Sequence, residues 1–231
     1  MKKFTVFSVF VLAFMLAACS SAPKKNPHLD GYWQSKGKKI AYKRFSAPKR
    51  WAPGQYIVMG TLDDGDRISV TKTTIVRREA GGWVFESVST DEDGKVSGTQ
   101  MLIRGYEQAV KKKDTSKIKV IWMKTLRPDG TVQKIEGDAL TIYNMMLKST
   151  WDKVIISGNS YTKAGAVTVP AGTFAGTTML KASVKLIFTF TQISYLHPSV
   201  PVNGLVKATD EDGKVLQVLL DYGFNGKAAI K

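Results

Sequence analysis

From residue 55 onward, hydrophobic and β-branched residues occur in short runs separated by turn-forming residues. The runs in the first half of this region cover residues 55–62, 67–78, 83–90, 96–104, 117–126 and 132–135. Those in the second half cover residues 167–169, 173–184, 185–195, 204–210 and 215–222. Asp-Gly pairs between several runs favour hairpins, because aspartate and glycine tolerate the positive φ angles of tight turns. The pattern predicts one mostly antiparallel sheet of about ten strands.

Two segments have helical periodicity instead. Residues 106–113 are short and polar, whereas residues 138–153 repeat apolar side chains at helical spacing. Asp138 is placed to cap the start of the longer helix. Its expected apolar stripe contains Ile142, Met145, Met146 and Leu147, with Trp151 close by. Because a sheet of this size curls or closes, we predict a mostly β (α+β) fold. In it, a curved sheet or incomplete β-barrel holds one or two packed helices.

The N-terminus has the layout of a secretory signal, with Lys2 and Lys3 before an apolar run at 4–16. This run is shorter than the roughly 20 residues that span a bilayer. The segment Leu16-Ala17-Ala18-Cys19 resembles the lipobox of bacterial lipoproteins. The resemblance implies cleavage before Cys19 and acylation of its sulfur and new amino group. A plain secretory signal is the alternative.

Ser20 follows the lipobox cysteine. Lipoproteins retained in the inner membrane of enteric bacteria typically carry aspartate at that place. The resemblance therefore implies sorting to the outer membrane, with the chain anchored by lipid on its periplasmic face.

The charge is unevenly distributed along the chain. Lysine and arginine number 34 against 19 acidic residues, a net charge of +15. Between residues 24 and 50 the single acidic residue is Asp30, and the basic residues are Lys24, Lys25, Lys36, Lys38, Lys39, Lys43, Arg44, Lys49 and Arg50. We interpret residues 1–18 as a cleaved signal peptide, 19–53 as a basic flexible tether and 54–231 as one β-rich domain.

A basic segment beside a bilayer is attracted to anionic lipid by about 1 kcal/mol per charge. The basic residues of the tether, Lys24, Lys25, Lys36, Lys38, Lys39, Lys43 and Arg44, are therefore candidates for contact with the membrane. The alternative is a solvated linker whose charge aids solubility alone. Nucleic acid is not an expected partner, because the signal exports the chain and the sequence has no nucleic-acid-binding motif.

Motifs for catalysis are missing from the sequence. It has no Gly-x-Ser-x-Gly elbow, no phosphate-binding loop and no His-Glu-x-x-His. Acylation would consume Cys19, the one cysteine. His197, at a strand end before Pro198, suits a structural turn better than a general base. We therefore predict a protein that is not an enzyme and uses no cofactor.

The heptapeptide TDEDGKV occurs twice, at residues 90–96 and 209–215. Its carboxylates raise the question of calcium, but an EF-hand loop needs a glutamate at its twelfth position. That position holds Leu102 or Asp221, counted from Asp91 or Asp210. Hairpin turns account for both copies, and no metal site is predicted.

The segment 167–223 contains VTVPAGTF and then YLHPSVPVNGLVKATDEDGKVLQVLLDYG. It resembles the C-terminal part of uncharacterised envelope proteins related to the Lol-type lipoprotein-carrier superfamily. The resemblance covers about a quarter of the chain. It implies an incomplete β-barrel closed by helices around an apolar cavity, although a shared fold does not confer a shared function.

Methionine suits adaptable apolar surfaces, and six methionines lie in the folded part. Two interpretations are open: an ordinary core, or a cavity of acyl-chain size. From the second we predict non-enzymatic binding of an apolar or amphipathic envelope ligand, on a face lined by Met145, Met146, Phe188 and Phe190. The alternative function is a structural or interaction module of a cell-envelope complex, using the sheet edge or the basic tether.

Overall fold

A computed structural model describes residues 26–43, 50–112, 114–151, 161–185 and 189–231 of the chain. Its helical elements are the 3-10 helices η1 (Asp30–Trp33) and η2 (Thr115–Lys117) and the α-helices α1 (Tyr106–Lys112) and α2 (Gly137–Trp151). The first seven strands are β1 (Lys39–Ile40), β2 (Tyr56–Asp63), β3 (Asp66–Glu79), β4 (Gly82–Asp91), β5 (Val96–Arg104), β6 (Lys119–Leu126) and β7 (Val132–Ile135). The others are β8 (Tyr161–Lys163), β9 (Val167–Val169), β10 (Gly172–Phe174), β11 (Thr178–Lys185), β12 (Thr189–Leu196), β13 (Leu205–Thr209) and β14 (Val215–Gly223).

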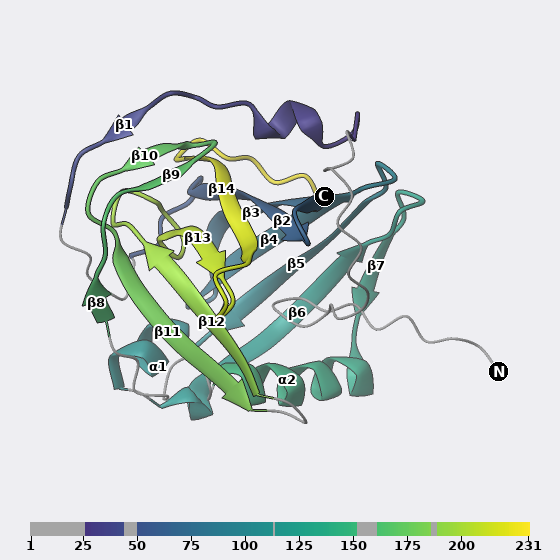
Figure 1. The fold of residues 1–231 in the computed structure, drawn as a ribbon. Coiled ribbons are helices and arrows are strands. Elements are labelled where there is room, and N and C mark those ends of the chain that lie inside the picture. The colour runs from purple at the N-terminus through teal and green to yellow at the C-terminus, as the bar shows by residue number, and fades with distance from the viewer. Residues whose placement is uncertain (1–25, 44–49, 113, 152–160, 186–188) are drawn as a thin grey trace.

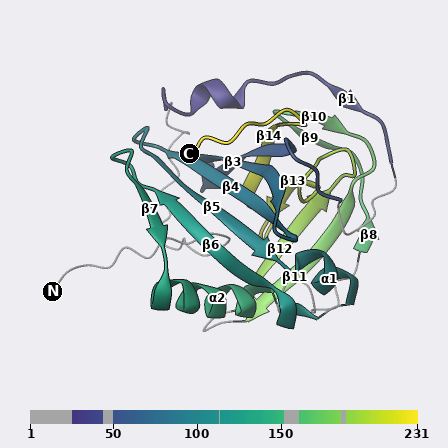
Figure 2. The ribbon, with the colours of Figure 1, turned by 180° about the vertical axis from the view of Figure 1, so that it is seen from behind.

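Eleven strands form one antiparallel sheet, in the order β7-β6-β5-β4-β3-β2-β14-β13-β12-β11-β8. The sheet is not closed, and it curls so that β11 and β12 lie across from β5 and β6 (Figure 1). The view from behind shows the same crossing, with α2 running along the lower side of the curl (Figure 2). A second sheet, β1-β10-β9, has three strands. The predicted fold class, a curved antiparallel sheet with few helices, is confirmed.

Tight turns connect the long strands where the sequence predicts them. Asp64 and Gly65 both have positive φ angles between β2 and β3, as do Ala80 and Gly81 between β3 and β4. Two positive φ angles in a two-residue loop match the right-handed twist of the flanking strands. The expected strand at 173–184 is instead divided into β10 and β11, because Gly176 has a φ of 63° and turns the chain between them.

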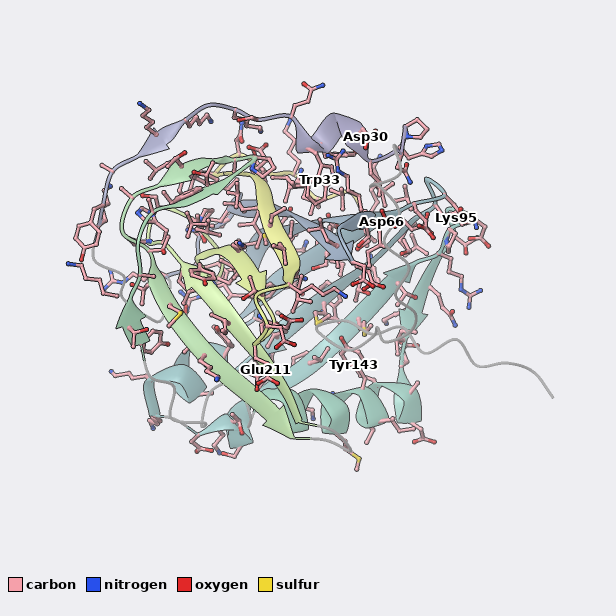
Figure 3. The ribbon with its side chains drawn as sticks, viewed as in Figure 1. Asp30, Trp33, Asp66, Lys95, Tyr143 and Glu211 are labelled. Atoms are coloured by element: carbon pink, nitrogen blue, oxygen red, sulfur yellow. The ribbon has the colours of Figure 1, made fainter. Side chains whose placement is uncertain are left out.

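The segment of residues 26–43, called here the N-terminal strap, lies on one face of the large sheet. Leu29 is completely buried there, and Trp33 packs against the main hydrophobic core. Figure 3 shows Trp33 and Asp30 on this segment. Further along, β1 pairs in parallel with β10. The flexible tether predicted over residues 19–53 is therefore wrong for this stretch, because apolar residues and a short strand attach it to the domain.

The C-terminal tail, residues 224–231, crosses the same face of the sheet. Ile230 is buried, and its amide and that of Ala229 donate to the two carboxylate oxygens of Glu86, at 2.9 and 2.7 Å. Gln100 completes the arrangement by donating to Glu86 and to the Ile230 carbonyl, both at 2.9 Å. Because Glu86 is only 2% exposed, these donors replace the water that its carboxylate has lost.

Candidate functional site

Strand register places two kinds of residue on the inner face of the sheet, the face toward α2. Directly paired residues in antiparallel strands point to the same side. One set of such pairs forms an apolar row across five strands: Ile75, Phe85, Met101, Met123 and Ile135. Leu140 and Tyr143 of α2 pack against this row, which identifies the inner face. Figure 3 shows Tyr143 rising from α2 toward the sheet.

Next to the apolar row, the inner face changes to hydroxyl-bearing side chains. Two neighbouring rows, called here the hydroxyl rows, run across β3 to β6 and across β3 to β5. The first contains Thr73, Ser87, Thr99 and Thr125, and the second contains Thr71, Ser89 and Ser97. Thr61, Ser69 and Gln217 extend the polar surface toward β14. The inner face of the curved sheet therefore presents the apolar row beside a broader surface of uncharged polar side chains.

The hydroxyl rows contain direct side-chain contacts. The hydroxyl oxygens of Thr71 and Ser89 are 2.6 Å apart, and those of Thr73 and Ser87 are 3.0 Å apart. Thr73 and Thr99 are buried, whereas Thr71 and Ser89 are half-buried. Each hydroxyl has one donor and two acceptor sites, so a bonded pair retains capacity for a further partner. Such hydroxyls can form hydrogen bonds with hydroxyl, amide or phosphate groups without supplying a charge.

An aromatic cluster lies at the end of the inner face near α1. The ring of Trp51 stacks on that of Tyr106, with centroids 3.9 Å apart, and meets the edge of Phe85 at 4.5 Å. The indole nitrogen of Trp51 donates to the Val202 carbonyl at 2.8 Å. Burial raises the pKa of Tyr106 to about 12. These contacts hold the cluster as a fixed apolar wall.

The helix α2 lies at the predicted place, but two residues of its predicted apolar stripe are exposed rather than packed on the sheet. Met145 is 69% exposed and Ile142 is also exposed. The cause is Asn144, whose amide accepts from the Val120 amide at 2.7 Å and donates to the Val120 carbonyl at 3.0 Å. This pairing turns the Leu140 and Tyr143 side inward. Met145 is therefore not among the α2 residues that pack on the sheet, and its contact with a ligand stays a prediction.

The other three predicted ligand residues remain predictions. Phe188 lies outside the described residues, and the side chains of Met146 and Phe190 lie outside the described part as well. Described residues line two small cavities. One, of about 210 Å³, lies where α2 begins beside Ile121, Trp122 and Ile135. The other, of about 180 Å³, lies on the outer face near Tyr32, Val58 and Lys72. Both are smaller than the roughly 300 Å³ at which ligand pockets usually begin.

The predicted anchor and membrane-proximal residues divide between described and undescribed parts. Cys19, Lys24, Lys25 and Arg44 lie outside the described residues. Lys36 forms an ion pair with Asp221, and its amide donates to the Pro170 carbonyl at 2.9 Å. Lys38, Lys39 and Lys43 are exposed on the strap, with Lys39 in β1. These four lysines therefore sit on the folded domain rather than along a free tether.

His197 is completely buried in the turn after β12. Its Nδ1 accepts from the Ser199 amide at 3.2 Å, and its ring meets that of Phe174 with centroids 5.3 Å apart. This geometry matches the structural role favoured from the sequence.

The two TDEDGKV copies form equivalent hairpin turns, between β4 and β5 and between β13 and β14. Asp91 accepts from the amides of Asp93 and Lys95, and Asp210 accepts from those of Asp212 and Lys214. In both turns the leading carboxylate is therefore used to bind its own backbone. Within the described residues, no group of three or more acidic, histidine or cysteine side chains is arranged to hold a metal ion.

In the described part of the chain, no helix combines the length and the apolar character needed to cross a membrane.

The hydroxyl rows are absent from the sequence-based predictions, although their signal is present in the sequence. Serine or threonine occupies alternate positions at 69, 71 and 73, at 87 and 89, and at 97 and 99. Because alternate strand positions share a face, this period of two on three successive strands predicts a hydroxyl-lined surface.

Comparison with protein-family models and with curated proteins finds no match for this chain. Among solved structures, it is similar to a candidate lipoprotein from Parabacteroides distasonis. That protein is 14% identical over 74% of this chain and 96% of its own, with a TM-score of 0.36. It is also similar to a candidate exported protein with a YmcC-like fold from Bacteroides fragilis, which is 10% identical over the same shares, with a TM-score of 0.33.

Proposed function

We propose that this protein is an outer-membrane lipoprotein, anchored through Cys19 and facing the periplasm, that binds an amphipathic envelope molecule on the inner face of its sheet. The observation that carries the proposal is the apolar row lying directly beside the hydroxyl rows. A purely apolar ligand would bury these hydroxyl groups while leaving part of their hydrogen-bonding capacity unused, which is unfavourable. An amphipathic ligand would place its apolar part along the apolar row and its polar part against the hydroxyl rows.

The sequence supports the anchor, and the chemistry of the inner face supports binding rather than catalysis. The inner rows of β3 to β6 offer hydroxyl groups and methionine side chains, which suit reversible contact. Serine and threonine hydroxyls donate and accept hydrogen bonds at modest net free energy, about 0.5–1.5 kcal/mol each. Several such contacts together hold a ligand that must later be released.

The edge strands give less support to the alternative of an assembly module that pairs through a sheet edge. The edges β7 and β8 have only four and three residues. They carry Lys134 and Lys163, and short charged edges discourage pairing with another chain.

Native mass spectrometry with organic extraction tests the proposal on protein purified from membranes. We expect a lipid-sized or glycolipid-sized mass that is bound noncovalently, in addition to the covalent mass added at Cys19. The informative variant is Thr71→Val/Ser89→Ala, which removes both members of the 2.6 Å hydroxyl pair at once. Because no partner is left unpaired, the fold is retained while at least two ligand contacts are lost. Occupancy should fall about 5-fold or more.

Thr168→Val/Thr173→Val is the matched control, since it removes a similar hydroxyl pair, 3.0 Å apart, from the small sheet. It should leave occupancy unchanged. Wild-type protein without any noncovalent mass, or equal losses in the two variants, would overturn the binding proposal. Absence of the covalent mass at Cys19 would overturn the anchor separately.

A further inference from the structure

The outer face of the large sheet is covered only in part. The strap and the C-terminal tail lie over β2 to β5: Trp33 contacts Gly60, and Ile230 contacts Gly98. Toward β7, no other described segment covers the outer face, although the last residue of the tail reaches β6, where Lys124 donates to the Lys231 carbonyl at 3.2 Å. The charged residues of this region are mainly basic. We define the basic outer patch as Arg77, Arg104, Lys119, Lys124 and Lys134.

Register and contacts bring these five side chains together. Arg104 pairs directly with Lys119, and Lys124 pairs directly with Lys134. Between them lies Trp122, with the Arg77 guanidinium 5.9 Å from its ring centroid. Trp122 pairs directly with Leu102, which lies two residues before Arg104 in β5 and therefore on the same face of the sheet. The patch is thus a continuous surface on β3, β5, β6 and β7 with an aromatic ring at its centre.

Acidic residues only partly neutralise the patch. Glu79 forms an ion pair with Arg77 at 2.6 Å and accepts from the Trp122 indole at 3.0 Å. Glu136 forms an ion pair with Lys134. Five basic residues against these two acidic ones leave a net charge of +3. The Trp122 and Arg77 contacts lower the pKa of Glu79, so this carboxylate stays ionised and is included in the count.

The start of the strap ties this face to the lipid anchor. Asn26 is held at the β4–β5 turn, where its side-chain amide donates to the Glu92 carbonyl at 2.8 Å. Cys19 is seven residues earlier, so a fully extended chain reaches at most about 24 Å. Since the strap lies on the outer face, an anchor at Cys19 holds the bilayer within that distance of the same side of the sheet.

We propose that the basic outer patch lies against anionic lipid headgroups of the membrane to which the chain is anchored. This rests on the proposed anchor and adds an orientation. The outer face meets the bilayer, and the inner face with its hydroxyl rows points away from it. Each basic side chain near an anionic surface contributes a favourable attraction that salt screens. Trp122 suits the headgroup level, because its ring is apolar and its indole nitrogen is polar.

Fluorescence quenching on the full-length acylated protein tests this orientation. A dye attached at Val132→Cys reports on the exposed outer face of β7, and a dye at Thr162→Cys reports on β8 at the opposite edge. The protein is reconstituted in vesicles of phosphatidylcholine alone, or of three parts phosphatidylcholine to one part phosphatidylglycerol. Acrylamide, an uncharged quencher, measures exposure in both. We expect the quenching constant at residue 132 to fall at least about 2-fold in the anionic vesicles, with no change at residue 162.

The variant Arg104→Gln/Lys119→Gln/Lys124→Gln should abolish this protection, as should high salt. Lys111→Gln/Lys112→Gln/Lys163→Gln removes the same charge from exposed positions on α1 and β8, and should retain it. Equal quenching at residue 132 in both kinds of vesicle would overturn the proposal. So would protection by soluble dextran sulfate alone, which would indicate an anionic polymer as the partner.

Failure of the anchor gives a different result. Protein that does not float with phosphatidylcholine vesicles lacks a working anchor, whereas protein that floats but shows equal quenching lacks the docking face. In the first case, flotation with the anionic vesicles still tests the patch. It should be lost in the Arg104→Gln/Lys119→Gln/Lys124→Gln variant, and flotation that persists there would overturn the docking proposal.

Discussion

The indole ring of Trp33 fills the space that a side chain at Gly60 would occupy. A Cβ atom at Gly60 would lie 2.4 Å from the Trp33 Cζ2 atom, well inside contact distance. Gly60 is in β2, at the middle of the large sheet, and Trp33 ends η1. Arg67 reinforces the contact, because its guanidinium is 4.8 Å from the Trp33 ring centroid and donates to Asp30 at 2.5 Å. One glycine in the sheet therefore accommodates the N-terminal strap.

Gly60→Ala should loosen the strap. The added methyl forces Trp33 outward, and overpacking of this kind costs about 1–3 kcal/mol. The measurements are urea unfolding and the rate of tryptic cleavage after Lys36, Lys38 and Lys39, which should increase. Gly31→Ala is the matched control, because a Cβ there meets no atom within 4 Å. An unchanged unfolding midpoint and unchanged cleavage in Gly60→Ala would contradict a packed strap.

The strap also shows which parts of the fold could be predicted from sequence. The long strands were predictable, because alternation and Asp-Gly turns act locally and both signals are strong in β2 to β6. Attachment of the strap depends on Trp33 meeting Gly60, 27 residues later in the chain. No local pattern encodes that contact, and a basic segment after a predicted signal peptide indicates a linker instead.

The inner face gives a second lesson of the same kind. The period of two in Ser69, Thr71 and Thr73 is a local signal, and it was available in the sequence. Its alignment with Ser87 and Ser89 was not, because that depends on strand register, which the turn between β3 and β4 sets. The alternation of serine and threonine along one strand was therefore predictable, whereas their alignment across neighbouring strands required the structure.

Removing Glu86 should release the C-terminal tail. In Glu86→Ala, the buried donors of Ile230 and Gln100 and the partly buried amide of Ala229 lose their acceptor, and unsatisfied buried groups cost about 1–3 kcal/mol each before relaxation. We expect a loss of about 2–4 kcal/mol in the free energy of unfolding. Hydrogen exchange at the Ala229 and Ile230 amides should become faster than in wild type. Glu86→Gln retains one acceptor oxygen and should lose less.

Glu92→Ala is the control for this variant, since Glu92 is exposed in the β4–β5 turn. It should leave both stability and tail exchange unchanged. Wild-type exchange rates at Ala229 and Ile230 in Glu86→Ala would show that the tail is held by apolar contacts of Ile230 alone.

Alkaline pH should destabilise the domain through two partly buried tyrosines. Burial raises the pKa of both Tyr106 and Tyr143 from the ordinary value of 10.0 to about 12. The folded state therefore holds these protons more tightly than the unfolded chain does. The associated stability is fully present below pH 10 and is lost as pH rises from 10 through 12. The urea midpoint measured against pH should fall in that window.

The slope in this window should be smaller in Tyr106→Phe and in Tyr143→Phe, because phenylalanine has no proton to lose. Tyr32→Phe, which removes an exposed tyrosine, is the control. It retains all the lysines, so any general effect of alkali on them is present in it as well. A wild-type slope in both buried-site variants would mean that other groups cause the alkaline loss.

The rotation of α2 can be tested through Asn144. Its side-chain amide satisfies both the amide and the carbonyl of Val120, at a bulge between β5 and β6. Asn144→Leu leaves these two backbone groups without their partner, which should lower the free energy of unfolding by about 1–3 kcal/mol. It also removes the contact that sets which side of α2 faces the sheet. Because Tyr143 packs against the apolar row from that side, its near-ultraviolet circular dichroism should weaken.

Met145→Ala separates helix rotation from a general effect of changing α2. Met145 is exposed, so its truncation should change neither stability nor ligand occupancy. If Met145→Ala instead removed a bound ligand while Asn144→Leu had no effect, the helix would present its methionine stripe to the sheet. The apolar part of the binding face would then be the one expected from the sequence. If Asn144→Leu alone is destabilising, then Asn144 decides which side of α2 faces the apolar row, by bonding to Val120 at the bulge between β5 and β6.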